Sequence, residues 1–256
     1  MAEILKVGDG PAERRLAVET RAGAGAPIVW LGGFRSDMRG SKAERLDAFA
    51  ARAGHAYVRF DYAGHGESGG QFADCTLSTW LEDAQAVIAA HVHARPLLVG
   101  SSMGGWIALL LARALAGTAR APAGIVLIAP AADFTQRLMW EAFPDVVRAD
   151  ILERGVHHLP SAYGDPYPIT RALIEDGRRH LLLDGAIETG CPVHILQGMR
   201  DPDVPWRHAL LTLERIATDN VALTLVKDGD HRLSREEDLA LLERTVAAML
   251  EAISGA

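Results

Sequence analysis

Short runs of mainly apolar residues recur along the chain, and stretches with helical spacing lie between them. The apolar runs lie at residues 28–31, 56–60, 96–99, 124–129, 192–198 and 222–226. Runs of this length, bounded by turn-forming residues, are typical of strands that are buried on both faces. Between the runs, residues 41–53, 77–88 and 106–115 carry apolar side chains at the spacing of amphipathic helices. Because strand and helix alternate, the sequence predicts an α/β fold with a mostly parallel sheet and helices on both faces.

The two ends of the chain show weaker patterns. Residues 14–20 alternate between polar and apolar, which predicts a half-exposed edge strand. Near the other end, Ser234 and Glu237 have the spacing of a capping box, which predicts the start of a terminal helix. The buried side of that helix is expected to carry Leu239, Leu242, Val246 and Leu250.

The alternation is interrupted between residues 131 and 190, where no strand pattern is evident. This segment contains several aromatic residues and prolines at positions 144, 160, 166 and 168. A long insertion after a sheet strand is a common place for a lid over a functional site. We therefore expect residues 1–256 to form a single domain with a small cap at about 131–190.

The composition argues against several kinds of partner and cofactor. The formal net charge is -7, and no cluster of Lys and Arg is interleaved with aromatics, so a nucleic-acid partner is not expected. The only cysteines, Cys75 and Cys191, lie far apart and without His or Cys at metal-ligand spacing. Neither a disulfide framework nor a zinc site is indicated, and we expect no metal and no cofactor.

No stretch has the pattern of a targeting or membrane-spanning sequence. The first residues lack a basic region followed by a long apolar stretch, and no apolar run approaches the ~18 residues that span a bilayer. We therefore expect a cytoplasmic protein without a membrane span, and the sequence leaves its oligomeric state open.

One short stretch combines a strand, a turn and a helix with a chemical group. Residues 100–104 read Gly-Ser-Ser-Met-Gly and lie between an apolar run and a helical run. In that context, Gly-x-Ser-x-Gly is the nucleophile-elbow pattern, in which a strained turn holds a serine hydroxyl above the end of a parallel sheet. Ser102 occupies the apex and is the expected nucleophile. Ser101 occupies an x position and is expected to point into the structure.

A serine hydroxyl needs a nearby base, and the base needs a carboxylate that holds its tautomer. In a doubly wound hydrolase sheet these groups follow the strands in the order serine, acid, histidine. Asp201 follows the run at 192–198 and is the expected acid, with Asp203 as the competing choice. His231 directly follows the last run and is the expected general base.

Acyl transfer also develops an oxyanion, which two backbone N–H groups commonly stabilise. One donor is expected to be the amide of Met103, directly after the nucleophile and at the start of a helix. The other is expected to be the amide of Phe34, which follows Gly32 and Gly33, with the amide of Gly33 as the alternative.

Other residues give weaker signals. His65 lies in a turn-rich loop beside the expected site, where a structural role is more typical than catalysis. Aromatic residues are more often core than contact, but several in the expected cap are candidates to line a pocket for an acyl chain. They are Trp140, Phe143, Tyr163 and Tyr167.

Six stretches, spread over most of the chain, match one family pattern in order and spacing. They are Gly32-Gly33-Phe34 and residues 59–64, 99–106, 159–163, 198–206 and 230–232. Together they resemble the motifs of the mammalian mitochondrial acyl-glucuronide esterases and palmitoyl-protein thioesterases of the α/β-hydrolase superfamily. The resemblance implies an α/β-hydrolase fold with a small cap and a triad of Ser102, Asp201 and His231. Residues 133–159 depart from the family pattern, which leaves the acyl chain and the leaving group open.

The expected function is that of a serine hydrolase that cleaves carboxylic ester or thioester bonds through an acyl-enzyme. Its expected partner is a small-molecule ester or thioester, or an acylated protein; palmitoyl thioesters and acyl glucuronides are suggestions of the family resemblance. Two alternatives stay open. The same residues would serve an acyltransferase or perhydrolase, and the fold also occurs in non-catalytic binding proteins, which usually lack a triad member.

Overall fold

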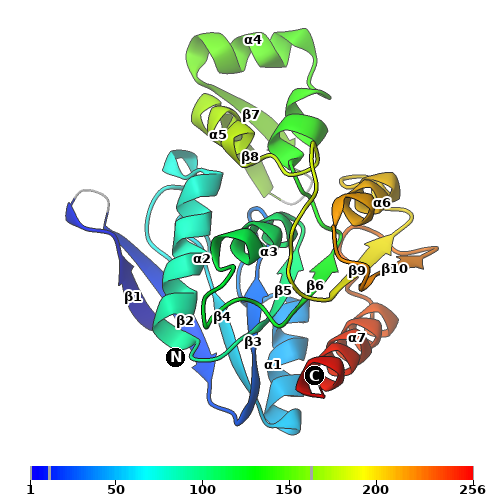
Figure 1. The fold of residues 1–256 in the computed structure, drawn as a ribbon. Helices are drawn as coiled ribbons and strands as arrows, with labels where there is room; N and C mark the ends of the chain where they lie inside the picture. The colour runs from blue at the N-terminus through cyan, green and yellow to red at the C-terminus, as the bar shows by residue number, and fades with distance from the viewer. Residues whose placement is uncertain (1, 11–12, 162–163, 256) are drawn as a thin grey trace.

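An eight-stranded sheet forms the centre of the protein, in the order β1-β2-β4-β3-β5-β6-β9-β10 (Figure 1). This computed structural model describes residues 2–10, 13–161 and 164–255. The strands of this sheet are β1 (Glu3–Val7), β2 (Arg14–Arg21), β3 (Gly25–Leu31), β4 (His55–Phe60), β5 (Leu97–Ser101), β6 (Gly124–Ile128), β9 (Val193–Gly198) and β10 (Val221–Val226). Pairing is antiparallel for β1 with β2 and for β2 with β4, and it is parallel for the rest. The mostly parallel sheet that the sequence predicts is confirmed.

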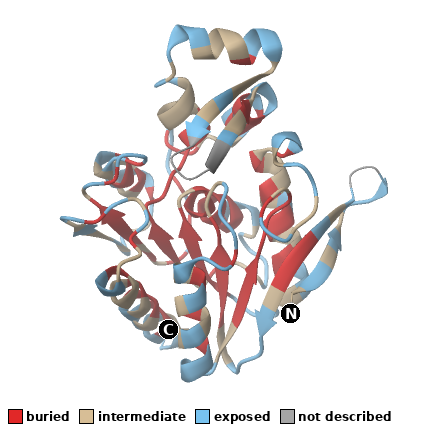
Figure 2. Ribbon diagram, turned by 180° about the vertical axis from the view of Figure 1, so that it is seen from behind, coloured by how far each residue is buried: buried red, intermediate tan, exposed pale blue. Residues whose placement is uncertain are grey.

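Helices cover both faces of the sheet, because successive side chains of a strand point to opposite faces. In β3, Ile28 and Trp30 join the core cluster that includes residues of α1 and α7, whereas Val29 and Leu31 join the cluster that includes residues of α2, α3 and α6. The helices are α1 (Ser41–Ala53), α2 (Leu77–His91), α3 (Met103–Ala114), α6 (Trp206–Arg215) and α7 (Glu236–Ser254). Buried residues therefore fill the inner strands of the main sheet, whereas the edge strands β1 and β10 have none (Figure 2).

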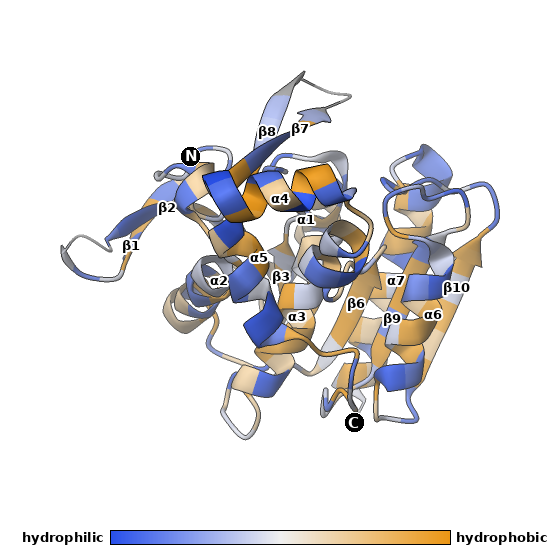
Figure 3. Cartoon of the chain, turned by 90° about the horizontal axis from the view of Figure 1, so that it is seen from above, coloured by the Kyte–Doolittle hydropathy of each residue, from blue (hydrophilic) through white to orange (hydrophobic). Residues whose placement is uncertain are grey.

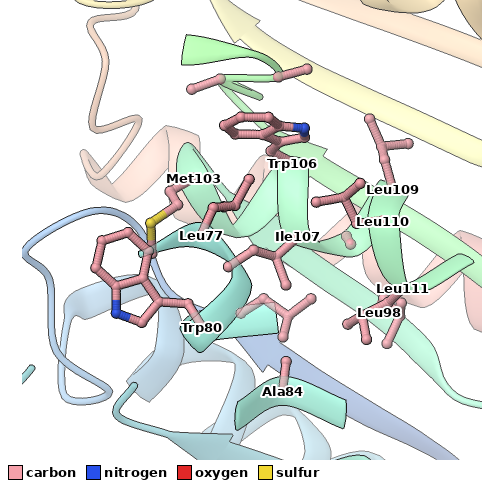
Figure 4. Close-up of a cluster of buried hydrophobic side chains, with 14 of the residues drawn as sticks. Leu77, Trp80, Ala84, Leu98, Met103, Trp106, Ile107, Leu109, Leu110 and Leu111 are labelled. Carbon is pink, nitrogen blue, oxygen red and sulfur yellow. The ribbon is translucent and has the colours of Figure 1, made fainter. Parts of the chain in front are cut away.

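The packing of α2 against α3 anchors the segment that carries the expected nucleophile. Trp80 of α2 and Trp106 of α3 are the two largest fully buried side chains among the described residues, and Leu77 and Ile107 lie with them in the same cluster (Figure 4). Burial of a large apolar side chain contributes about 1.5–3 kcal/mol. Because α3 begins directly after Ser102, its burial holds the adjoining turn in place.

The segment between β6 and β9 projects above the sheet and contains strands that the sequence analysis did not detect (Figure 1). Its elements are a π-helix (Thr135–Trp140), α4 (Asp145–Arg154), β7 (Val156–Ser161), β8 (Gly164–Thr170), α5 (Arg171–Gly177) and a 3-10 helix (Arg178–His180). β7 and β8 form an antiparallel hairpin, so the expectation of no strand at 131–190 is wrong. Prolines at 160, 166 and 168 hid the hairpin, because proline is excluded from central strands but tolerated where both strands are edges.

Hydrogen bonds join the two ends of this segment at its base. The carboxylate of Asp133 is fully buried and accepts from the amides of Leu182 and Leu183, at 2.8 and 2.9 Å. The indole N–H of Trp106 donates to the carbonyl of His180 at 3.2 Å. Farther from the sheet, α4 is largely exposed (Figure 2) and the hairpin carries hydrophilic residues (Figure 3). The segment is therefore fixed at its base and more exposed at its outer end.

Two expectations about the chain ends are also wrong. Residues 14–20 do not form an edge strand, because β1 pairs with β2 and covers it. At the terminal helix, Asp238 accepts a hydrogen bond from the amide of Arg235 at 3.2 Å, so the cap lies one residue after Ser234. Acidic residues stand three positions after both Ser234 and Arg235, which left the sequence pattern ambiguous. None of the helices in the described part of the chain has the length and apolar composition that a membrane crossing requires.

Candidate active site

Ser102 lies in a strained turn between β5 and α3. Its backbone angles are φ 54° and ψ -116°, a conformation that costs on the order of 1–3 kcal/mol for a residue other than glycine. Hydrogen bonds on both sides hold this turn. The amide of Ser102 donates to the carbonyl of Ile128 at 2.9 Å, and its carbonyl accepts from Gly105 and Ala131 at 2.9 and 3.1 Å. Such strain persists where the surroundings determine it and is typical of functional sites.

The two glycines of the elbow pattern are required by close backbone contacts. A Cβ on Gly100 would lie 2.3 Å from the carbonyl oxygen of Gly104. A Cβ on Gly104 would lie 2.0 Å from the carbonyl oxygen of Leu31, on the neighbouring strand. Since no side chain fits at either position, the strand–turn–helix geometry depends on glycine at both.

Asp201 and His231 are brought together from loops that follow adjacent strands, β9 and β10. Nδ1 of His231 lies 2.7 Å from Oδ2 of Asp201. An ionised carboxylate only accepts hydrogen bonds, so Nδ1 carries the hydrogen and Nε2 is left unprotonated in the neutral ring. This is the tautomer that a general base requires.

The carboxylate of Asp201 is fully buried and well hydrogen-bonded. Oδ1 accepts from the amides of Asp203 and Val204, each at 2.8 Å, and Oδ2 accepts from Nε2 of Gln197 at 3.1 Å. Asp203, the competing choice, is exposed, and the structure pairs His231 with Asp201. Sequence reasoning missed Gln197; a polar residue at the end of a buried strand was the signal that could have found it.

The loop that carries Phe34 lies directly beside Ser102. A Cβ on Gly33 would lie 3.4 Å from the Cβ of Ser102. The next residue, Arg35, has a positive φ of 57°, and its amide donates to Nε2 of His65 at 3.1 Å. Nδ1 of His65 lies 3.1 Å from the carbonyl of Ala63, so it carries the hydrogen. His65 therefore has the structural role that the sequence suggests, and it fixes the Phe34 loop.

The backbone N–H groups of Phe34 and Met103 have no hydrogen-bond partner among the described residues. Met103 is the first residue of α3, so its N–H has no partner within the helix and lies at the positive end of the helix dipole. Neither amide thus has a competing acceptor in the described part of the chain, as a donor to an oxyanion requires. The choice between Phe34 and Gly33 as the second donor stays a prediction.

Ser102 and His231 line the same two pockets. One has a volume of about 680 Å³ and the other about 590 Å³, and both also contact Phe34 and Arg35. Within the described residues, Ser102 Oγ and His231 form no direct hydrogen bond. Because catalytic hydrogen bonds often tighten only in the substrate complex, the contact of His231 with Ser102 stays a prediction.

The two pockets differ in chemistry. The larger one, which we call the polar pocket, is lined by charged residues that the other pocket lacks; these are Asp37, Lys42, Arg200, Asp230 and Arg232. The smaller one, which we call the apolar pocket, lies under the cap; its lining includes Phe134, Leu138, Met139, Phe143, Leu159 and Tyr167. Ser102 therefore lies where a charged surface meets an apolar one.

The aromatic residues that the sequence singled out have different positions. Phe143 and Tyr167 line the apolar pocket, and the guanidinium of Arg35 lies 4.6 Å from the centre of the Tyr167 ring. Trp140 instead stacks under the guanidinium of Arg178, at 4.9 Å. Tyr163 lies outside the described residues.

One group of side chains in the described part of the chain has the spacing of a metal site. It consists of Asp201, Asp203 and His231, with one potential ligand atom from each lying within 4.8 Å of the others. Both oxygens of Asp201 already accept hydrogen bonds, one of them from His231. The carboxylate of Asp201 is thus already fully hydrogen-bonded, and its arrangement with His231 fits an acid–base pair better than a metal site.

Comparison with known proteins identifies the family of the chain. The pattern of the Alpha/beta hydrolase family matches residues 23–244. The chain belongs to the alpha/beta hydrolase family. The expected α/β-hydrolase fold and the family resemblance are therefore both confirmed.

Members of this hydrolase family with curated names include the palmitoyl-protein thioesterase ABHD10, mitochondrial, of Mus musculus. It is 35% identical over 243 residues, which cover 93% of this chain and 80% of that protein. The Homo sapiens protein of the same name is 32% identical over 241 residues, covering 93% and 78%. A mitochondrial location is part of those names, so the expected cytoplasmic location is not confirmed by them.

Solved structures of the hydrolase family superpose over nearly the whole chain. A putative hydrolase from Agrobacterium vitis S4 has a TM-score of 0.95 and 48% identity, and the match covers 98% of each chain. Alpha/beta hydrolase domain-containing protein 10 from mouse has a TM-score of 0.87 and 32% identity, covering 98% of this chain and 100% of that one.

Proposed function

We propose that this protein is a serine hydrolase that cleaves carboxylic ester or thioester bonds through an acyl-enzyme intermediate. The observation that carries the proposal is the strained Ser102 on the wall of two pockets that His231 also lines, with His231 hydrogen-bonded to Asp201. Membership in a hydrolase family, and thioesterases among the curated relatives, support it.

In this mechanism Ser102 Oγ attacks the carbonyl carbon of the substrate while Nε2 of His231 takes the hydroxyl proton. The negative charge of Asp201 orients the ring and stabilises the imidazolium that forms. The amides of Met103 and Phe34 donate to the oxygen of the tetrahedral intermediate, and loss of one such donor commonly costs about 2.7–4 kcal/mol of transition-state stabilisation.

Collapse of the intermediate breaks the ester or thioester bond, and His231 returns the proton to the departing alcohol or thiol. Water then attacks the acyl group on Ser102, with His231 again as the base, and releases the carboxylic acid. Every proton transfer in this cycle passes through one imidazole, so no cofactor is required.

The two pockets suggest how a substrate lies across Ser102. We infer that the apolar pocket takes the acyl chain and the polar pocket takes the leaving group. A volume of about 590 Å³ falls in the range of ligand pockets, about 300–1,000 Å³. The curated relatives are named as palmitoyl-protein thioesterases, so long-chain acyl thioesters are the first substrates to try. A cytoplasmic location stays part of the proposal, and fractionation of the source cells would test it.

The test is turnover of acyl thioesters of graded chain length, p-nitrophenyl esters and acyl glucuronides. We expect the wild type to release free acid and Ser102→Ala to be inactive. Undiminished turnover by Ser102→Ala would contradict the proposal. Product analysis with added alcohol, thiol or peroxide identifies acyl transfer, because a transferase or perhydrolase would form a new acyl product in place of the acid.

A further inference from the structure

The loop that carries His231 needs support from outside its own strand. It connects β10 to α7, and β10 is an edge strand with no fully buried residue. A displacement of about 1 Å at a catalytic group can cost about 100-fold in rate. The contacts that hold this loop therefore bear directly on the position of the imidazole.

Contacts from the C-terminal half hold one side of the loop. The carboxylate of Asp230 accepts from the amides of Arg232 and Leu233, at 3.1 and 3.0 Å. The amide of Arg200, in the loop after β9, donates to the carbonyl of Gly229 at 2.9 Å. Two of these bonds lie within the loop itself, and the bond from Arg200 ties it to the loop that follows β9.

Lys42 reaches the loop from the opposite side of the site. It is the second residue of α1, and its amine donates to the carbonyl oxygen of Arg232, the residue after His231. Its side chain also lines the polar pocket together with Ser102 and His231. A lysine from the N-terminal half thus anchors the backbone next to the imidazole.

The surroundings of Lys42 do not favour a charged amine for stability alone. Burial, followed by the positive charge of Arg232, lowers the pKa of Lys42 to about 8, and the carboxylates of Asp230 and Asp238 act in the opposite direction. A group whose charged form is disfavoured on folding reduces stability at neutral pH. The position of this lysine is therefore better explained by function.

We propose that Lys42 is a positioning residue: by holding the Arg232 carbonyl it keeps the imidazole of His231 within reach of Ser102. The inference rests on the proposed hydrolase function. Lys42 acts through His231 and takes no part in bond making or breaking.

Helix α1 has other anchors, which make a matched control possible. Arg45 forms ion pairs with Glu236 and Glu243 of α7, and the hydroxyl of Tyr57 donates to the carbonyl of Ala43 at 2.9 Å. Loss of Lys42 leaves these contacts in place. Arg45→Met removes a cation from the same helix but leaves the hydrogen bond from Lys42 to Arg232 in place.

The experiment compares the wild type, Lys42→Met, Lys42→Arg and Arg45→Met by ester turnover, by the rate of fluorophosphonate labelling and by thermal unfolding. We expect Lys42→Met to lower kcat and the labelling rate about 10- to 100-fold with little change in KM. Its Tm is expected to be equal to or higher than that of the wild type. Lys42→Arg, which keeps a donor, is expected to recover part of the rate, and Arg45→Met to keep the wild-type kcat.

Each contrary result has its own meaning. A wild-type kcat in Lys42→Met would overturn the proposal, and so would a change confined to KM, which would make Lys42 a substrate contact. An equal loss in Arg45→Met would show that α1 as a whole matters rather than this hydrogen bond. A wild type that neither turns over esters nor becomes labelled would instead refute the proposed hydrolase function.

Discussion

The floor of the candidate site and its roof are built in different ways. The floor consists of the loops at the strand ends that carry Ser102, Asp201, His231 and Phe34, and backbone and side-chain hydrogen bonds fix the conformation of each. The roof is the cap segment, whose apolar side chains line one pocket while α4 stands largely exposed. Under the proposed function, we therefore expect substitutions in the floor to change the reaction rate and substitutions in the roof to change the choice of substrate.

Asp201→Asn should produce the largest loss of activity. An amide in place of this buried carboxylate changes the tautomer of His231, and the equivalent change in a known triad lowers kcat about 10,000-fold. Steady-state kinetics of Asp201→Asn and Asp203→Asn would measure the difference. Asp203 is exposed and donates only its backbone amide to Asp201, so its variant should lose far less. An equal loss of kcat in the two variants would contradict the choice of Asp201 over Asp203 as the acid.

Gly104→Ala should lower the stability of the protein far more than a glycine-to-alanine substitution in the cap. The new Cβ would lie 2.0 Å from the carbonyl oxygen of Leu31, so the floor must move, at a cost of about 4 kcal/mol or more. In the cap, Gly155→Ala meets no atom within 4 Å and costs only the strain of its φ of 81°, about 1 kcal/mol. Chemical denaturation of both variants tests the contrast between floor and roof. A similar loss of stability in Gly104→Ala and Gly155→Ala would mean that the turn at Ser102 is not tightly packed.

His65 should make the floor sensitive to acid. Burial lowers the pKa of His65 to about 4, below its unfolded value of about 6.5. Between these values the unfolded state binds the extra proton, so stability is fully present above about pH 6.5 and falls as pH drops toward about 4, by up to about 3 kcal/mol. Chemical denaturation across this pH range should show that the free energy of unfolding depends less on pH in His65→Gln than in the wild type. If the free energy of unfolding changes with pH equally in both proteins, protonation of His65 is not the cause of the acid sensitivity.

Phe143→Ala should have the smallest effect and a selective one. This side chain lines the apolar pocket, so its loss should raise KM for long-chain substrates about tenfold and leave short-chain esters nearly unchanged. Val146→Ala, at a cap residue that is 71% exposed, is the matched control. Kinetics over a chain-length series separates the two. An equal effect on short and long chains would place Phe143 in a purely structural role.

Much of the floor could be predicted from the sequence because local rules govern it. The alternation of apolar runs with stretches of helical spacing predicted the parallel sheet. The spacing of the glycines around Ser102 predicted the tight turn that the structure contains. The order of strand ends placed Asp201 and His231 close enough to predict their hydrogen bond. Each of these inferences uses short-range patterns whose three-dimensional outcome is determined by backbone geometry.

The roof and the supporting contacts could not be predicted in the same way. The hairpin of β7 and β8 contains prolines that argue against a strand, and only its position away from the main sheet permits them. Gln197 lies only four residues from Asp201 and carried a local signal, whereas Lys42 and its partner Arg232 are 190 residues apart. No local pattern marks such a pair, because their contact depends on how α1 and the last loop pack.

The most direct test of the central claim is to trap the acyl-enzyme and locate the acyl group. A slowly hydrolysed ester or thioester is mixed with the wild type, the reaction is quenched in acid, and peptides are analysed by mass spectrometry. The account predicts one added acyl group on the peptide that contains Ser102, and none in Ser102→Ala. An acyl group on another residue, or turnover without any acyl-enzyme, would contradict it.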